Sequence, residues 1–342
     1  MRAFITGVAG PALTDGERAF LREAQPWGLI LFSRNIAGPD PLRRLIAEFR
    51  ATLGRDAPVL IDQEGGRVQR LGPPHWPSYP PGAAYGALYD RDRAAGLAVA
   101  RLGARLIAAD LSCLRIDVDC LPIADVPVAG ADPVVGDRAY GNDPDKVAAI
   151  ARAIADGLVE GGVLPVLKHI PGHGRATSDS HERLPVVDAD RETLEATDFA
   201  AFRPLRDLPL AMTAHVVFSA VDPVAPATTS PVIVGDVIRD SIGFEGLLMS
   251  DDISMGALSG SLAERASAAI AAGCDMILHC NGKMPEMRAV AEAVPVLAGK
   301  AAQRAALALA AKRPPAPLDA PASRAEFLAL LAGIWQPAEG TA

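Results

Sequence analysis

The sequence predicts a single (β/α)8 barrel, and three observations support this fold class. Short runs that are apolar at nearly every position alternate along the chain with longer, alanine-rich amphipathic segments. Such runs are typical of parallel strands, because helices cover a parallel sheet on both faces. Glycine often stands just before a run, as at Gly162, Gly246 and Gly273, where a preceding helix would end. A chain of 342 residues has the length of one α/β barrel domain.

Eight strands are predicted in chain order, with helices between them. The strands cover residues 3–8, 28–32, 58–62, 114–124, 164–170, 210–216, 246–252 and 274–280. The clearest helices are predicted at residues 41–53, 94–109, 145–160 and 262–272. An open doubly wound sheet is the alternative, but no GxGxxG follows the first strand to support a dinucleotide site.

The domain organisation is expected to be simple. The barrel takes residues 1–311 as the catalytic domain, and a proline-rich linker, KRPPAPLDAPAS, follows at 312–323. The remaining segment, 324–342, contains RAEFLALLAGIW, whose apolar residues predict a C-terminal helix packed on the barrel, followed by a tail.

Composition argues against several classes of protein. The formal net charge is −8 and no run of basic residues occurs, which disfavours nucleic acid or an anionic membrane as a partner. No stretch approaches the roughly 18 apolar residues of a membrane helix, and the N-terminal apolar run is too short for a signal peptide. The four cysteines lack CxxC spacing and are expected to be buried free thiols. We therefore expect a cytoplasmic globular protein, as a monomer or a weak homo-oligomer.

Polar side chains follow most of the predicted strands at their carboxyl ends. These residues are Asp62, Glu64, Arg67, Arg70, Asp125, Arg138, Lys168, His169, His215, Asp251, Asp252 and His279. In a (β/α)8 barrel those strand ends meet at the face that carries the active site. The pattern therefore predicts a catalytic site at that face.

Three of the six histidines lie in one stretch, KHIPGHGRATSDSH, at residues 168–181. His169 and His173 have the i, i+4 spacing of two metal ligands on a helix. Pro171 and Gly172 lie between them and resist helix formation, so the spacing loses its geometric meaning. We expect no metal and no cofactor.

A carboxylate and a histidine point to glycoside hydrolysis. Asp251 ends a buried strand, where a carboxylate could be held beneath an electrophilic carbon, as a glycosidase nucleophile must be. Asp179 and His181 are two residues apart, so both face the same side of an extended segment. Asp179 could then accept one imidazole N–H and leave the other nitrogen for proton transfer. A solvated loop with an Asx turn would explain the same spacing, and the residues alone leave both interpretations open.

Four motifs resemble those of glycoside hydrolase family 3, and more narrowly its bacterial single-domain branch, the β-N-acetylglucosaminidases of peptidoglycan recycling. They are DQEGGRVQR, GDRAYG, KHIPGHG…DSH and MSDDISMGA, which begin at residues 62, 136, 168 and 249. They occur in the order and with the spacing of that family. The resemblance implies a (β/α)8 barrel and a two-step mechanism with retention of configuration.

The resemblance also implies a role for each matched residue. Asp251 matches the catalytic nucleophile and His181 the general acid/base, with Asp179 as its partner. The positions that hold the acetamido sugar are matched by Asp62, Arg70, Arg138, Lys168 and His169. The implied substrate is N-acetylglucosamine β-1,4-linked to anhydro-N-acetylmuramic acid, with or without a peptide. His173 is expected to shape the loop rather than to react.

Several alternatives stay open on the sequence. A β-glucosidase or β-xylosidase of the same family would keep the nucleophile but usually lacks the histidine loop. A substrate-assisted hexosaminidase would use two acids, but Asp251 and Asp252 are adjacent on a strand and point to opposite faces. A non-catalytic sugar-sensing barrel would need neither Asp251 nor His181. Finally, a histidine is uncharged when it acts as a base, so phosphate could replace water as the acceptor.

Overall fold

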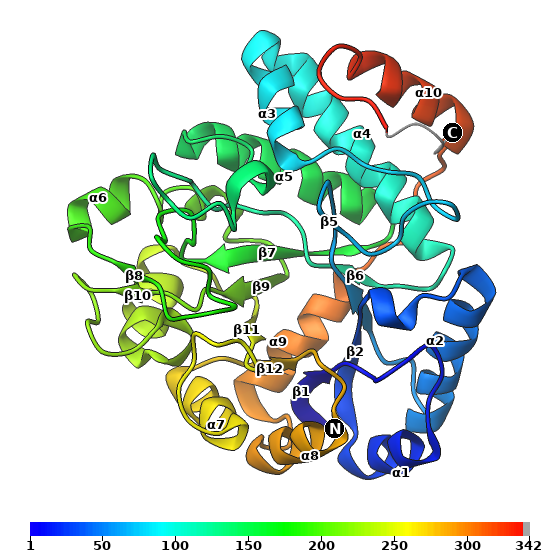
Figure 1. The fold of residues 1–342 in the computed structure, drawn as a ribbon, viewed down its shortest axis with the longest axis vertical. Coiled ribbons are helices and arrows are strands. Elements are labelled where there is room, and N and C mark those ends of the chain that lie inside the picture. Colours follow the sequence, from blue (N-terminus) through cyan, green and yellow to red (C-terminus); the bar gives the residue numbers. More distant parts are fainter. Residues whose placement is uncertain (338–342) are drawn as a thin grey trace.

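Eight parallel strands close into a barrel in the computed structural model, which describes residues 1–337 (Figure 1). The strands in chain order are β1 Arg2–Thr6, β2 Pro26–Leu31, β3 Val59–Ile61, β6 Val118–Asp119, β7 Leu164–Ile170, β9 Leu210–Thr213, β11 Leu247–Asp252 and β12 Met276–His279. Each predicted strand supplies one of them, and every neighbouring pair is parallel. The predicted (β/α)8 barrel is therefore confirmed, and the open doubly wound sheet is excluded.

The fourth barrel strand is much shorter than predicted. Only Val118 and Asp119 form β6, because the chain turns sharply there: the N–H of Leu121 donates to the carbonyl of Asp119 at 2.8 Å. Pro122 follows and has no N–H to donate. The chain nevertheless continues beside β7, where the backbone N–H of Lys168 donates to the carbonyl of Pro122 at 3.0 Å.

Helices cover the outside of the barrel. The predicted helices are present as α2 Pro39–Leu53, α4 Arg93–Ser112, α5 Pro144–Glu160 and α7 Leu262–Ala272. The others are α1 Asp15–Ala24, α3 Gly82–Arg91, α6 Arg191–Ala196, the π-helix Ile233–Ser241, α8 Met284–Ala293, α9 Gly299–Ala310 and α10 Ala320–Leu330. Side-chain caps set several starts: Thr14 and Glu17 form a capping box at α1, and Asp143 caps α5.

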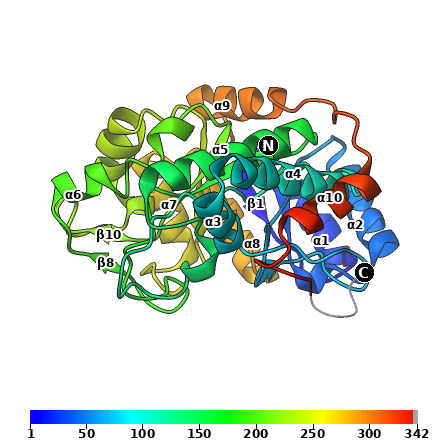
Figure 2. The same cartoon turned by 90° about the horizontal axis from the view of Figure 1, so that it is seen from above.

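Side chains fill the barrel, and helix α9 closes its amino-terminal end (Figure 2). The interior side chains include Ala3, Ile5, Trp27, Ile30, Leu60, Val118, Val166 and Met249. Ala305 and Ala308 of α9 pack against this cluster. Arg304 of the same helix pairs with Asp275 at 3.2 Å and with Glu245 at 2.8 Å. The open end of the barrel is therefore the carboxyl-terminal end of its strands.

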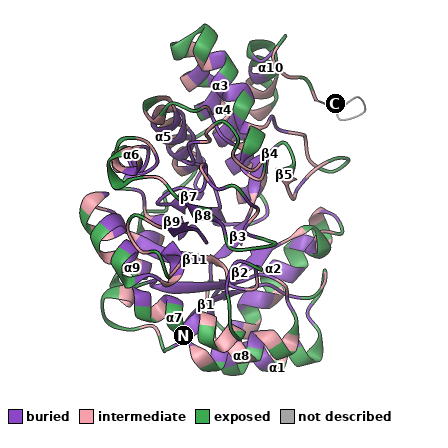
Figure 3. Ribbon diagram, turned by 60° about the vertical axis from the view of Figure 1, so that its left-hand side comes forward, coloured by how far each residue is buried: buried purple, intermediate pink, exposed green. Residues whose placement is uncertain are grey.

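Two small sheets stand at this open end. Strands β4 Gln63–Gly65 and β5 Val68–Gln69 form an antiparallel hairpin directly after β3. Strands β8 Val186–Val187 and β10 Val217–Phe218 pair in parallel in the segments that follow β7 and β9. Figure 3 shows the buried barrel strands and inner helix faces, with exposed residues on the outer sides of the helices and loops.

The last helix of the described residues is α10, which lies beside α4 (Figures 1 and 3). This helix begins at Ala320, inside the predicted linker 312–323, because Asp319 caps it by accepting the N–H of Ala322 at 3.1 Å. The end of the predicted tail, residues 338–342, lies outside the described residues. The division into barrel, linker and terminal helix stays a prediction.

The cysteines correspond to the prediction with one exception. Cys120, Cys274 and Cys280 are buried free thiols, whereas Cys113, the C-cap residue of α4, is exposed. Over the residues that the structure describes, no helix combines the length and the apolar character needed to cross a membrane.

Candidate active site

A pocket of about 280 Å³ opens at the carboxyl ends of the barrel strands. All eight residues predicted to bind or react line it: Asp62, Arg70, Arg138, Lys168, His169, Asp179, His181 and Asp251. They come from β7, from the end of β11 and from the segments that follow β3, β6 and β7. The fold therefore brings residues from distant parts of the sequence to one concave site.

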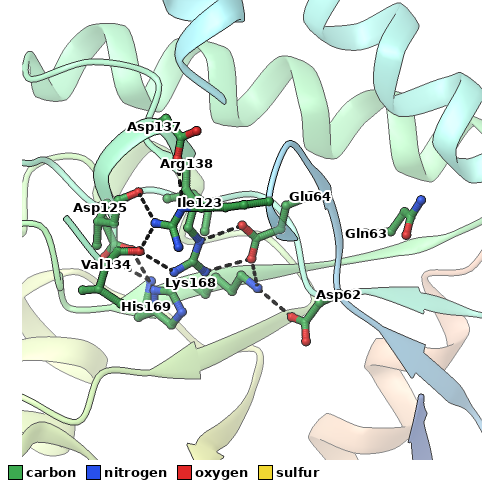
Figure 4. A network of polar contacts seen from close by, with 12 residues as sticks. Asp62, Gln63, Glu64, Ile123, Asp125, Val134, Asp137, Arg138, Lys168 and His169 are labelled. Atoms are coloured by element: carbon green, nitrogen blue, oxygen red, sulfur yellow. Dashed lines mark hydrogen bonds and ion pairs between the residues drawn. The ribbon is translucent and has the colours of Figure 1, made fainter. Parts of the chain in front are cut away.

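One wall of the pocket is a network of alternating carboxylates and cations (Figure 4). The Nζ of Lys168 lies 2.8 Å from Oδ1 of Asp62 and 2.6 Å from Oε1 of Glu64. Arg70 lies 3.2 Å from the other oxygen of Asp62, and Arg138 forms a bidentate pair with Glu64, with both N–O distances at 2.8 Å. Because opposite charges face each other throughout, the network can be buried and held in one geometry.

The charges on this wall are stable around neutral pH. Burial raises the pKa of Asp62, but the ammonium of Lys168 and the guanidinium of Arg70 outweigh it and hold that pKa well below its usual value. Burial also lowers the pKa of Lys168, yet the carboxylates of Asp62 and Glu64 raise it overall. The wall therefore presents permanent donors beside permanent acceptors, which suits the hydroxyl groups of a sugar.

A further carboxylate, Asp125, orients two histidines. Burial raises the pKa of Asp125, but the imidazole of His169 and then that of His173 bring it down to about 2, so the group is ionised. An ionised carboxylate only accepts, so Nδ1–H of His169 donates to it at 2.7 Å, and so does the backbone N–H of His173, also at 2.7 Å. This leaves Nε2 of His169 without a hydrogen bond from the described residues, and His169 lines the pocket.

Asp179 and His181 lie together on the loop after β7. Oδ1 of Asp179 lies 2.7 Å from Nδ1 of His181 and accepts its backbone N–H at 2.9 Å. Burial raises the pKa of Asp179, but the hydrogen bonds from His181 lower it overall and keep the group ionised. The side chain of His181 is 65% exposed, so its second nitrogen is accessible from the pocket and from solvent.

The segment after β11 holds this loop in place. The N–H groups of Gly256 and Ala257 donate to the carbonyls of His181 and Ser180 at 3.1 and 3.0 Å. A Cβ at Gly256 would lie 2.8 Å from the carbonyl oxygen of His181, so a larger residue would push the loop away. Within the loop, Nε2 of His173 lies 2.9 Å from Oγ of Ser180. The loop is thus tied both to itself and to the strand that ends in the predicted nucleophile.

Asp251 is the less constrained of two adjacent carboxylates. Its Oδ1 accepts the backbone N–H of Asp252 at 2.7 Å, which leaves Oδ2 without a hydrogen bond from the described residues. Burial raises the pKa of Asp251, but nearby imidazoles, that of His215 first, lower it overall. Asp252 accepts both the hydroxyl and the N–H of Ser254, at 2.6 and 3.0 Å. Asp252 therefore supports the backbone, while Asp251 is the carboxylate that is free to react.

Comparison with known proteins agrees with this site. Residues 7–312 match the model of the glycosyl hydrolase family 3 N-terminal domain. The chain belongs to glycoside hydrolase family 3. Two relatives named beta-hexosaminidase come from Alkalilimnicola ehrlichii, 40% identical over 80% of this chain and 79% of the relative, and from Methylococcus capsulatus, 41% identical over 80% and 81%.

Solved structures agree with the family assignment. NagZ from Neisseria gonorrhoeae in complex with N-trifluoroacetyl-D-glucosamine is 31% identical, has a TM-score of 0.84 and covers 97% of both chains. A family 3 β-N-acetylglucosaminidase from Paenibacillus sp. str. FPU-7 is 29% identical, with a TM-score of 0.80 over 99% of this chain and 64% of that one. The family 3 chain is a glycoside hydrolase of the β-N-acetylhexosaminidase type and acts on carbohydrate. The predicted family and enzyme class are confirmed.

Glu64 and Asp125 organise the family 3 site but were predicted only as polar strand ends. Glu64 bridges Lys168 and Arg138, and the spacing in DQE could have indicated it, because Asp62 and Glu64 are two apart and face one side of an extended segment. The role of Asp125 could not be predicted locally, since its partner His169 lies 44 residues further along the chain.

The histidines of the family 3 enzyme are not arranged as metal ligands. His169 donates to Asp125, and Nε2 of His173 is engaged by Ser180. Within residues 1–337, no group of three or more His, Cys, Asp or Glu side chains has a geometry that could hold a metal ion.

Proposed function

We propose that the protein is a retaining, exo-acting β-N-acetylglucosaminidase that forms a glycosyl ester on Asp251 and uses His181, paired with Asp179, as its general acid/base. The observation that carries this proposal is that a free carboxylate and a carboxylate-bound imidazole line the same pocket. The pocket is small, with a volume of about 280 Å³, which suits one terminal sugar better than the interior of a polymer.

In the first step, Oδ2 of Asp251 attacks the anomeric carbon while the bond from that carbon to the leaving oxygen breaks. The protonated imidazole of His181 gives its proton to the leaving oxygen, so the aglycone departs as a neutral alcohol. Asp179 supports this transfer because its carboxylate faces the other ring nitrogen and stabilises the imidazolium.

In the second step, the neutral imidazole of His181 removes a proton from water, and the water oxygen attacks the anomeric carbon. The ester bond to Asp251 breaks, which restores the carboxylate and releases the sugar with its original β configuration. His181 ends the cycle protonated, as it began. A histidine suits both tasks because its ordinary pKa of about 6.5 lies near neutrality.

The remaining predicted residues bind the sugar. Lys168 and Arg70 supply donors and Asp62 supplies acceptors, held in register by their ion pairs. Arg138 shares this wall through Glu64. His169, fixed by Asp125, turns its free nitrogen toward the ring.

The proposed substrate is a muropeptide that carries N-acetylglucosamine β-1,4-linked to anhydro-N-acetylmuramic acid. The enzyme would act in peptidoglycan recycling in the cytoplasm. It would work as a monomer or a weak homo-oligomer. The family motifs support this choice, and so does the N-trifluoroacetyl-D-glucosamine bound by the NagZ relative. No metal, cofactor, nucleic acid or membrane takes part in the proposed reaction.

The test is the release of nitrophenol from its β-N-acetylglucosaminide, measured beside the β-glucoside and repeated after exhaustive chelation. Chelator-resistant turnover of the acetamido sugar alone is expected. Turnover of the glucoside instead would overturn the proposed substrate. Loss of activity on chelation would overturn the metal-free mechanism. Identical product mixtures in phosphate and in a non-nucleophilic buffer would identify water, rather than phosphate, as the acceptor of the sugar. Product configuration by NMR, and the mass of the quenched enzyme, test retention and the ester.

A further inference from the structure

We propose that the C-terminal helix α10 positions the β4–β5 hairpin of the binding wall through Tyr79, and thereby contributes to substrate affinity. Helix α10 starts at Ala320, beyond residue 312, where the family match ends. The proposal rests on the proposed function only in taking the pocket as the substrate site.

The first link joins α10 to the hydroxyl of Tyr79. Arg324 of α10 donates to that oxygen at 3.2 Å and lies over the ring, with its Cζ 5.5 Å from the ring centroid. The hydroxyl in turn donates to Oδ2 of Asp110 on α4 at 2.6 Å, and Arg324 lies 3.5 Å from the same oxygen. Phe327, which is 1% exposed, packs its ring 6.3 Å from that of Tyr79. The side chain of Tyr79, itself only 1% exposed, is therefore held by α4 and α10 together.

The second link joins the backbone of Tyr79 to the hairpin. The N–H of Gly66 donates to the carbonyl of Tyr79 at 2.9 Å, and the N–H of Tyr79 donates to Oε1 of Gln69 at 2.9 Å. A Cβ at Gly65 would lie 3.2 Å from the Cβ of Tyr79 and 2.2 Å from the carbonyl oxygen of Pro80. The hairpin thus packs directly on this segment, and both its turn, at Gly66, and the end of β5, at Gln69, are bonded to Tyr79.

The third link joins the hairpin to the pocket. Gln69 is followed at once by Arg70, and Glu64 comes just before the glycines of the turn. Oε1 of Gln63 accepts the N–H of Arg70 at 3.0 Å, so the two strands of the hairpin move as one body. A shift of the hairpin therefore moves two groups of the wall. One is the guanidinium of Arg70, which pairs with Asp62. The other is the carboxylate of Glu64, which lies between Lys168 and Arg138.

A helix that only covers apolar surface would change stability and leave affinity alone. A positioning helix instead changes KM at temperatures well below unfolding, with little change in kcat, since neither the nucleophile nor the acid/base is touched. Measuring KM and kcat separately therefore distinguishes a positioning helix from a helix that only covers apolar surface.

The kinetic test uses Arg324→Ala and Tyr79→Phe in the full chain, with the nitrophenyl β-N-acetylglucosaminide as the probe. Each variant is expected to raise KM about three- to tenfold and to keep kcat within about twofold. Arg324→Lys should restore most of the affinity, since an ammonium can still pair with Asp110. The matched control is Arg101→Ala: Arg101 lies on α4 and pairs with Glu160 of α5, with no polar contact to Tyr79 or α10 among the described residues, so KM should be unchanged.

Hydrogen–deuterium exchange of residues 63–71 tests the link without turnover. Exchange should be faster in Arg324→Ala than in the wild type and unchanged in Arg101→Ala. An unchanged KM in both Arg324→Ala and Tyr79→Phe, or unchanged exchange of the hairpin, overturns the proposal. If the wild type does not cleave the probe, the proposed function fails, and the exchange measurement still decides whether α10 holds the hairpin.

Discussion

The carboxylate of Asp179 accepts both the ring Nδ1–H and the backbone N–H of His181, at 2.7 and 2.9 Å. Because the partners are two residues apart, both belong to the loop after β7, and any displacement of that loop would keep the pair together. The chemically similar pair of Asp125 and His169 joins positions 44 residues apart and is fixed to the barrel. One pair is therefore suited to approach a leaving group, and the other to hold a ring in place.

Replacing the acid/base should discriminate between leaving groups. In His181→Ala, kcat/KM for a disaccharide is expected to fall about a thousandfold, because a sugar alkoxide needs a proton to depart. Release of a nitrophenol, which leaves readily as an anion, should fall much less in the glycosylation step, measured as the pre-steady-state burst. Equal losses for both substrates would contradict the acid role. Asp179→Asn should show the same preference in a weaker form.

Removing the nucleophile should abolish turnover of every substrate. Asp251→Asn is expected to lower kcat at least about a thousandfold for both leaving groups, since no ester can form. Asp252→Asn is not a control without structural effect, because Asp252 accepts the hydroxyl of Ser254. The stability of this variant must therefore be measured together with its activity. Residual activity above one per cent in Asp251→Asn, with no wild-type contamination, would assign the nucleophile elsewhere.

The buried ammonium of the binding wall should be essential for affinity. Lys168→Met leaves the carboxylates of Asp62 and Glu64 facing each other without their shared cation. We expect the free energy of unfolding at pH 7 to fall by about 3–5 kcal/mol and KM to rise at least about tenfold. Lys283→Met, which removes an exposed lysine 3.2 Å from Glu286, is the control and should change neither urea unfolding nor KM.

Acid should destabilise the protein through the buried imidazole of His173. Burial lowers the pKa of His173 to about 4, below its ordinary value of 6.5. Between those two values the unfolded chain binds a proton that the folded protein does not, so stability falls as the pH drops from 6.5 to 4. The full contribution is about 3 kcal/mol.

The matched variant for this titration is His173→Gln, which keeps an N–H for Ser180 but cannot be protonated. The free energy of unfolding is measured by urea titration at pH 6.5 and at pH 4. Between these two pH values it should fall by about 3 kcal/mol less in the variant than in the wild type. Parallel pH profiles for the two proteins would contradict this assignment. Asp125, whose pKa is about 2, loses its contribution only below this window.

Sequence alone was sufficient for the barrel, because its signal is local. A strand buried on both faces must be apolar at nearly every position, and a helix between two such strands must have one apolar side. The strand-end rule also placed Asp62, Lys168 and Asp251 at one face, since parallel strands share a direction. The fourth strand was overestimated because its apolar run continues through a turn and Pro122, where the regular strand conformation is interrupted although the chain stays beside β7.

What only the tertiary structure decided is which polar groups pair with which. Glu64 lies between Lys168 and Arg138, and Asp125 holds His169, through contacts between segments that are remote in the sequence. The path from α10 to the hairpin is of the same kind. Hydrophobic patterning repeats with the period of a strand or helix, so it can be detected along the chain. An ion pair instead depends on where two separate elements meet, and the closure of the barrel determines those meeting points.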